Sequence, residues 1–129
     1  MPSFGTTSRN RLDTCHADLQ RLFNVVVLSF NCSVLAGHRG QVEQDRLHAE
    51  GKSKLKYPDS RHNKYPSMAV DVVPYPVDWT DINRFYFFAG FVKATALNLG
   101  ITIRFGGDWD SDTHVSDQDF MDLPHYELV

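Results

Sequence analysis

The segment Ser60–Val73, SRHNKYPSMAVDVV, passes from a polar loop into an apolar run. Its second half, Met68–Val73, is rich in β-branched residues and alternates in part, which is typical of a strand that enters the core. The run Pro74-Tyr75-Pro76 follows and closes that strand. The segment therefore predicts a core strand that carries one aspartate, Asp71, and a preceding loop that carries His62.

Asp71 has apolar neighbours on both sides, so its carboxylate requires a charged partner. His62 and His125 are candidate companions, because a zinc ion in a hydrolytic site typically takes three ligands from His, Asp and Glu together with water. His125 begins a predicted terminal strand, and strand pairing can place it beside Asp71. Residue types and spacing leave an alternative open, in which Asp71 is a buried carboxylate paired with an arginine.

Asp122 lies shortly before His125, with Leu123 and Pro124 between the two residues. A carboxylate on the turn before a ligand-bearing strand can reach the same water molecule and act as a general base. The alternative is that Asp122 is an ordinary turn residue. The remaining histidines at positions 16, 48 and 114 are expected to lie at the surface.

Elsewhere in the chain, apolar residues at helical spacing predict two long helices. The first runs from about Thr7 to about Val27, with Thr7 or Ser8 as its N-cap. The second, Asp81–Leu99, is expected to be capped by Thr80 and ended by Gly100.

Shorter elements complete the predicted pattern. We expect an exposed helix at Gln41–Glu50, a loop at Lys52–Pro66, and further strands at Phe30–Ala36, Ile101–Phe105 and His125–Val129. The pattern indicates an α+β fold, with one small antiparallel or mixed sheet packed by helices. The 129 residues fit a single domain, 1–129.

Composition excludes several classes of function. The net charge of −3 gives no electrostatic footprint for nucleic acid, and no apolar run approaches the ~20 residues of a membrane-spanning helix. The N-terminal residues lack the basic and apolar regions of a signal peptide, which favours a cytoplasmic chain. Cys15 and Cys32 are expected to be buried thiols. The hydrophobic fraction of 42% can form a core without a metal, so a bound metal would serve chemistry.

The segment Gly106–Asp119 is a long acidic loop with aspartates at positions 108, 110, 112, 117 and 119. A loop of this length in a small domain is more often functional than idle. Its aspartates could bind calcium, but they match no calcium-loop spacing that we can name, which favours a solvated loop.

Several short motifs occur together in a fixed order. They are Ser60-x-His62, Ala69-x-Asp71 followed by Val72-Val73-Pro74, Gly106-Gly107-Asp108-Trp109, and Asp122-x-x-His125-x-Glu127-Leu128. In this order they resemble the zinc peptidoglycan peptidases of the D-Ala-D-Ala metallopeptidase family, and above all the phage L-alanyl-D-glutamate endopeptidases used as endolysins. The resemblance includes Gly37-His38-Arg39 and Gln44, and it covers most of the chain from about residue 33 onward.

The resemblance implies a fold like that of hedgehog and D-Ala-D-Ala peptidase domains, with Zn²⁺ held by His62, Asp71 and His125. It places Asp122 at the catalytic acid/base position and Arg39 where it would stabilise the oxyanion of the substrate carbonyl. It also implies that Ser60 lines the substrate site. The motif Asp108-Trp109 would lie near the cleft.

Two departures from the family pattern are visible. The loop between His62 and Asp71 is longer than usual, and Ser67 stands at the position of a common glycine. Asp122 replaces the glutamate of many relatives, so the backbone must approach the reacting water more closely.

The resemblance implies a zinc-dependent endolysin that cuts the L-Ala–D-Glu bond of the peptidoglycan stem peptide. Such an enzyme would wait in the host cytoplasm until lysis, and we expect it to be a monomer whose partner is peptidoglycan. Two alternatives remain: a D-Ala-D-Ala carboxypeptidase or dipeptidase on the same fold, and a binding module that has lost turnover.

Overall fold

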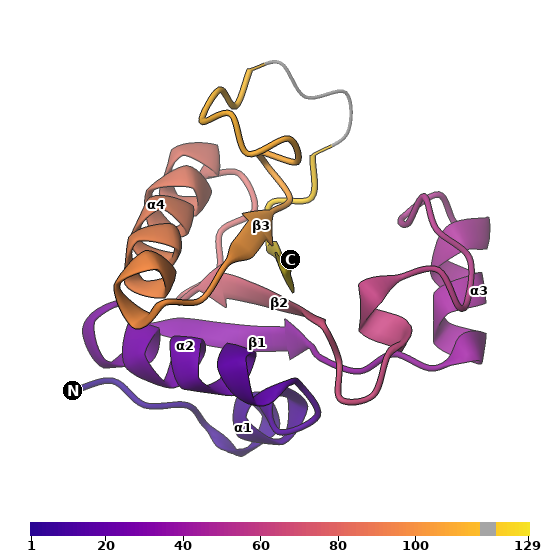
Figure 1. The fold of residues 1–129 in the computed structure, drawn as a ribbon, viewed down its shortest axis with the longest axis horizontal. Coiled ribbons are helices and arrows are strands. Elements are labelled where there is room, and N and C mark those ends of the chain that lie inside the picture. The colour runs from indigo at the N-terminus through magenta and orange to yellow at the C-terminus, as the bar shows by residue number, and fades with distance from the viewer. Residues whose placement is uncertain (117–120) are drawn as a thin grey trace.

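The computed structural model describes residues 1–116 and 121–129, and within them four strands form one antiparallel sheet (Figure 1). The strands are β1 (Cys32–Ala36), β2 (Ala69–Pro74), β3 (Ile103–Phe105) and β4 (His125–Leu128). Their spatial order is β1-β2-β4-β3, so the C-terminal strand is inserted between β2 and β3. The predicted α+β class is confirmed, and the sheet is antiparallel throughout.

Among the described residues, the helices are α1 (Thr6–Leu12), α2 (Ala17–Ser29), α3 (Gln41–Ala49) and α4 (Ile82–Leu99), with one 3₁₀ turn at Arg61–Asn63. Helices α2 and α4 pack against each other, α4 also packs against β2 and β3, and α1 lies along β1 (Figure 1). Aromatic rings fill the centre of this core, where Tyr126 of β4 packs edge-on against Phe23 of α2 and Phe88 of α4. The C-terminal strand is therefore anchored in the middle of the domain.

The first predicted helix is wrong in its extent, because the chain breaks it into α1 and α2. Cys15 leaves the helical path to form a β-bridge with Ser67, and the His16 amide donates to the carbonyl oxygen of Ser67 at 2.9 Å. The His16 ring then caps α2, since its Nδ1 accepts from the Asp18 amide at 3.0 Å. His16 is thus a helix cap, and the N-cap of α1 is Gly5 in place of Thr7 or Ser8.

The second long helix is confirmed, with a different cap. Asp81 is the N-cap of α4 and its carboxylate accepts from the Arg84 amide, whereas the Thr80 hydroxyl donates to Asp78. At the other end, Gly100 has a φ of 74°, a left-handed conformation that a glycine adopts without the steric cost of a side chain. The buried stripe of this helix contains Phe85, Phe88, Ala89, Val92 and Ala96.

Helix α3 stands apart from the sheet and, as predicted, is mostly exposed (Figure 1). Its one buried residue is Gln44, whose amide nitrogen donates to the carbonyl oxygen of Leu55 at 2.6 Å and to the Ser53 hydroxyl at 3.0 Å. This side chain holds the segment after α3 in place. That segment forms one wall of the cleft described below.

Both cysteines are free and buried, as predicted. Burial raises the pKa of the Cys15 thiol and that of the Cys32 thiol to about 12, so both side chains behave as small apolar groups. No helix among the described residues is long and apolar enough to cross a membrane.

Candidate active site

The register of the sheet brings the first two candidate residues together. Asp71 of β2 pairs directly with His125 of β4, and on the other side of β2 it pairs with Ala36 at the end of β1. Antiparallel partners have closely spaced Cα atoms, so their side chains meet on one face of the sheet. Pairing between strands far apart in the sequence therefore builds this part of the site.

His62 reaches the same point from the 3₁₀ turn. Ser60 and Asn63 form a capping box that stabilises this turn. The Ser60 hydroxyl accepts from the His62 amide at 3.2 Å, and the Asn63 side chain accepts from the Ser60 amide at 3.0 Å. The carbonyl oxygen of His62 also accepts from the Arg39 amide at 2.8 Å. These contacts fix a buried histidine on an otherwise polar segment.

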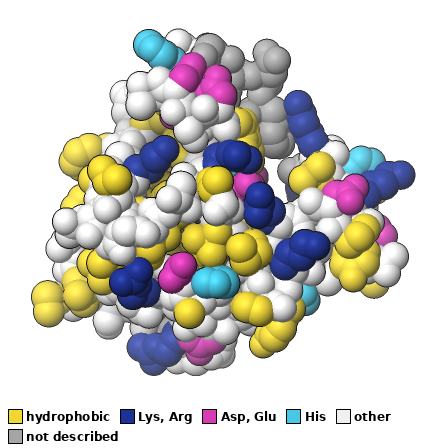
Figure 2. All heavy atoms as spheres, viewed as in Figure 1, with side chains coloured by type: hydrophobic (Ala, Val, Ile, Leu, Met, Phe, Trp, Pro, Cys, Tyr) yellow, Lys and Arg dark blue, Asp and Glu magenta, His cyan; other side chains and the backbone are white. Residues whose placement is uncertain are grey.

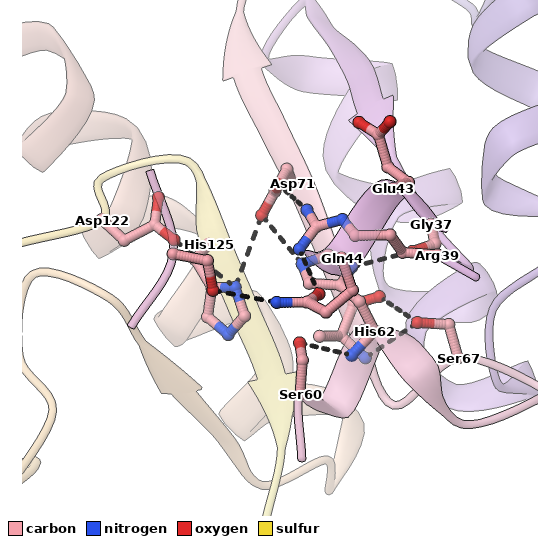
Figure 3. A network of polar contacts seen from close by, with 12 residues as sticks. Gly37, Arg39, Glu43, Gln44, Ser60, His62, Ser67, Asp71, Asp122 and His125 are labelled. Atoms are coloured by element: carbon pink, nitrogen blue, oxygen red, sulfur yellow. Dashed lines mark hydrogen bonds and ion pairs between the residues drawn. The ribbon is translucent and has the colours of Figure 1, made fainter. Parts of the chain in front are cut away.

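The three predicted ligands converge on one point (Figure 3). Asp71 Oδ1 lies 3.2 Å from His62 Nε2 and 3.4 Å from His125 Nδ1. The two imidazole rings are 5.1 Å apart, and one ligand atom from each of the three residues falls within 4.8 Å of the others. Asp71 also has the arginine partner that the alternative reading required, since Arg39 lies 3.5 Å from its Oδ2 atom.

The outer nitrogen of each imidazole is already engaged. His62 Nδ1 lies 2.8 Å from the carbonyl oxygen of Gly37, which can only accept, so this nitrogen carries a proton. His125 Nε2 lies 2.8 Å from Glu127 Oε1. The inner nitrogens, His62 Nε2 and His125 Nδ1, then face a carboxylate oxygen, and that arrangement requires either protons or a metal cation between them. Two imidazole nitrogens and one carboxylate suit zinc.

Charge within the cluster is strongly coupled. Burial would raise the pKa of Asp71, but the charges of His62 and His125 and the hydrogen bonds from both rings outweigh burial and hold this pKa far below its usual value. Burial would lower the pKa of His125, but its hydrogen bonds to Asp71 and Glu127 raise that pKa to about 9. The metal-free chain therefore keeps His125 as an imidazolium between two carboxylates.

Asp122 lies at the edge of the same cluster, with its Oδ2 atom 3.8 Å from His125 Nδ1. Its backbone is held against Gly106, because the Asp122 amide donates to the Gly106 carbonyl oxygen at 2.8 Å. A Cβ on Gly106 would lie 2.0 Å from the Asp122 carbonyl oxygen, so only glycine permits this approach. Burial, followed by the negative charge of Asp71, raises the pKa of Asp122. The contact with Gly106 fixes the backbone that carries the Asp122 side chain.

Arg39 and Ser60 also lie at the site. Besides its contact with Asp71, the Arg39 guanidinium donates to Gln44 Oε1 at 3.0 Å, and the same oxygen accepts from Asn63. Gln44 thus links the wall of the cleft to the cluster. Ser60 is buried and lines the cleft, where its hydroxyl caps the turn that carries His62.

A cavity of about 650 Å³ opens over the cluster. Its walls include Asp122, His125, the segment 52–55, Arg61 and Arg104. The space-filling view shows several Lys and Arg side chains where the α3 segment meets the rest of the molecule (Figure 2). Trp109 also lines this cavity, with its ring 5.2 Å from that of His125, so the motif at 108–109 lies near the cleft as expected.

The long loop before Asp122 begins with a tight cluster of aspartates. Ligand atoms of Asp108, Asp110 and Asp112 lie within 4.8 Å of one another, with Asp108 buried and the other two exposed. Asp108 accepts from the Thr113 amide through Oδ2 at 3.0 Å. The other two aspartates of this loop, at positions 117 and 119, lie outside the described residues.

Hydrogen bonds of Ser67 fix the unusually long loop between His62 and Asp71. The Ser67 amide donates to the Thr14 carbonyl oxygen at 2.8 Å, and its hydroxyl donates to the Ala69 carbonyl oxygen at 2.6 Å. Tyr65 and Pro66 are exposed and take up the extra length at the surface. The longer loop is compatible with the approach of His62 to Asp71.

Two residues have structural roles at the site that the sequence analysis did not assign. Gly37 supplies the carbonyl that orients His62, and Glu127 contacts the outer nitrogen of His125. Both occur in motifs that carried the family resemblance. An i, i+2 spacing of Glu127 and His125 on a strand was the available signal for a contact on one face.

Gly37→Ala should destabilise the protein by on the order of 2–3 kcal/mol and lower Tm by roughly 10 °C. A Cβ at this position would lie 2.3 Å from the Arg11 carbonyl oxygen and 2.4 Å from Thr14 Oγ1, so β1 and α1 would have to separate. Gly40→Ala is the matched control, because nothing lies within 4 Å of a Cβ there. Thermal unfolding of both variants checks the expectation, and equal Tm values would contradict it.

Comparison with known proteins gives one consistent result. A family described as phage L-alanyl-D-glutamate peptidase matches residues 2–129. The L-alanyl-D-glutamate peptidase of Escherichia phage T5 is 28% identical over 134 residues, with 98% of this chain and 97% of that protein covered. The crystal structure of the L-Ala D-Glu endopeptidase ChiX of Serratia marcescens is similar with a TM-score of 0.77 and 28% identity, covering 99% of this chain and 91% of that one.

Proposed function

Because the chain belongs to the phage L-alanyl-D-glutamate peptidase family, we propose that it uses zinc to hydrolyse the L-Ala–D-Glu bond of the peptidoglycan stem peptide. The chain is a peptidoglycan-degrading peptidase by family, and the proposal adds the metal and the roles of individual residues. The observation that carries it is the convergence of His62, Asp71 and His125 on one point at the floor of a cleft, with Asp122 beside them.

In this proposal, His62 Nε2, His125 Nδ1 and the carboxylate of Asp71 hold the zinc ion. A zinc ion in such a site supplies Lewis-acid catalysis and makes water a stronger nucleophile at neutral pH. The hydrogen bonds to the outer nitrogens of both rings support this assignment, because they leave the inner nitrogens as the available ligand atoms.

Asp122 acts as the general base and then as the general acid. It takes a proton from the attacking water and delivers it to the leaving amine of the D-Glu residue as the amide bond breaks. Its partial burial and its position beside His125 suit this role, since the carboxylate can reach a water molecule at the cluster.

Arg39 stabilises the negative charge that develops on the carbonyl oxygen. Its guanidinium is already at the cluster, and its contact with Gln44 orients it toward the cleft. Ser60 contributes to the same wall of the cleft, where it holds the turn that presents His62.

We propose that the protein acts as a monomer on the bacterial cell wall during phage lysis and remains in the host cytoplasm until then. The cationic residues around the cleft are consistent with this substrate, because a stem peptide carries free carboxylates that they would attract.

The proposal is tested by digestion of purified peptidoglycan with the zinc-loaded protein, followed by mass spectrometry of the products. We expect stem peptides released at the bond after L-Ala, and loss of this activity when a chelator removes zinc. Free D-Ala or the D-Ala-D-Ala dipeptide would instead identify a carboxypeptidase or dipeptidase. Binding to the wall without any cleavage would identify a binding module, and cleavage that persists in chelator would exclude the zinc mechanism.

A further inference from the structure

Glu127 is a buried carboxylate that the mechanism above does not use. It lies two positions after His125 on β4, so both side chains point to the same face of the sheet. Only 7% of the residue is exposed. Its strand partners are Ala69 on β2 and Arg104 on β3. A buried carboxylate is costly unless its oxygens are paired, so the contacts of this residue indicate why it is there.

Both oxygens of Glu127 are engaged, and with different partners. The Oε1 atom lies 2.8 Å from His125 Nε2. The Oε2 atom lies 2.9 Å from Arg61 Nε and 3.4 Å from Arg104 Nη1. On the side away from His125, the carboxylate therefore forms ion pairs with two guanidinium groups, that of Arg61 in the 3₁₀ turn and that of Arg104 on β3. Its remaining oxygen is directed at the histidine ring.

We propose that Glu127 is a positioning residue that orients His125 for metal binding, and that Arg61 and Arg104 hold Glu127 in that role. This inference rests on the zinc site of the proposed function. By accepting a hydrogen bond from Nε2–H of His125, Glu127 would keep the proton on that nitrogen in the zinc-bound protein, so that Nδ1, which faces Asp71, is the nitrogen that loses its proton to bind the metal. It also fixes the rotation of the ring about the bond that joins it to the chain.

The two histidines of the site are oriented in different ways. His62 donates to a backbone carbonyl, that of Gly37, and its tautomer is therefore set by the main chain. His125 depends on a side chain, so a single substitution can remove its partner while the fold stays intact. Partners of this kind typically change metal affinity by about 10–100-fold.

The first test measures zinc affinity by competition with a chromophoric chelator at fixed pH. Glu127→Ala should bind zinc about 10–100-fold more weakly than the wild type. Glu127→Gln nearly preserves the shape, but its single amide oxygen cannot accept from both His125 and the two arginines, and its NH₂ group can only donate, so this variant should also bind zinc more weakly than the wild type. Glu50→Gln is the matched control, since Glu50 is an exposed glutamate that pairs with Arg46 and Lys52.

The outcomes separate this inference from the proposed function. If the wild type binds zinc and the folded Glu127→Ala variant binds it within threefold, the role of Glu127 is overturned while the zinc site stands. A lower Tm with unchanged zinc affinity would show a purely structural residue and would also overturn it. A wild type that binds no zinc would overturn the metal site and the role of Glu127 together.

A second test needs no variant and covers the case in which Glu127→Ala does not fold. Long-range ¹H–¹⁵N spectra of the zinc-loaded wild type report which ring nitrogen of each histidine carries a proton. We expect His125 to keep its proton on Nε2 and to have none on Nδ1. A proton on Nδ1, with Nε2 bound to the metal, would overturn the inference.

Discussion

Asp122→Asn should lower kcat by a factor of roughly 10²–10⁴ and leave zinc binding and the fold close to those of the wild type. The substitution preserves the shape of the side chain and removes its capacity to accept and return a proton. Asp122 approaches His125 only at 3.8 Å and is not among the three converging ligands, so the metal should remain bound. The measurement is stem-peptide hydrolysis at saturating substrate, with zinc content determined on the same samples.

The control for this variant is Asp13→Asn, which removes an exposed carboxylate at the end of α1. It should retain the full rate. If Asp122→Asn hydrolyses the stem peptide as fast as the wild type with zinc in place, the base is another group and the assignment of Asp122 is wrong. Loss of both activity and zinc would instead make Asp122 a ligand.

Zinc affinity should rise about 100-fold between pH 6 and pH 8, which is about tenfold for each pH unit. The pKa of His125 is raised to about 9 in the metal-free chain, so below that pH the ring carries two protons. A metal ligand must be unprotonated at the coordinating nitrogen, and zinc therefore has to displace the Nδ1 proton. Lower pH therefore opposes zinc binding, and the pH dependence of the zinc affinity flattens as the pH approaches about 9.

Chelator competition at several pH values measures this slope, and calorimetry in two buffers with different ionisation enthalpies counts the protons released. We expect release of at least one proton for each zinc ion at pH 7. An affinity that does not change between pH 6 and pH 8 would mean that His125 is already neutral there, or that it is not a ligand.

Much of the fold could be predicted because its signals are local. The apolar stripe of Asp81–Leu99 and the β-branched run Met68–Val73 correspond to α4 and β2 with only small shifts at their ends. The predicted extent of the first helix was wrong because the break in the helix depends on a distant residue. The apolar periodicity continues through Cys15 and His16, but both residues make backbone contacts with Ser67 that local spacing does not encode.

The candidate residues of the site could be named from the sequence because their chemistry is restrictive. An aspartate in an apolar strand needs a charged partner, and few residue types can share a site with it. Residue types and spacing made His62 and His125 candidate partners of Asp71, and the resemblance to a known peptidase family then placed these three residues and Asp122 in one site. Their roles remain proposals that the experiments above test.

The sequence by itself determined the residue types, the class of fold and the family. The tertiary structure decided how the parts meet, because the insertion of β4 between β2 and β3 sets Asp71 opposite His125. It also decided where glycine is required, because a Cβ at Gly37 or Gly106 would clash with atoms of a second segment of the chain. Glu127 gained its role in the same way. These features arise from pairing and close contact between segments distant in sequence, and such contacts depend on the packed chain as a whole.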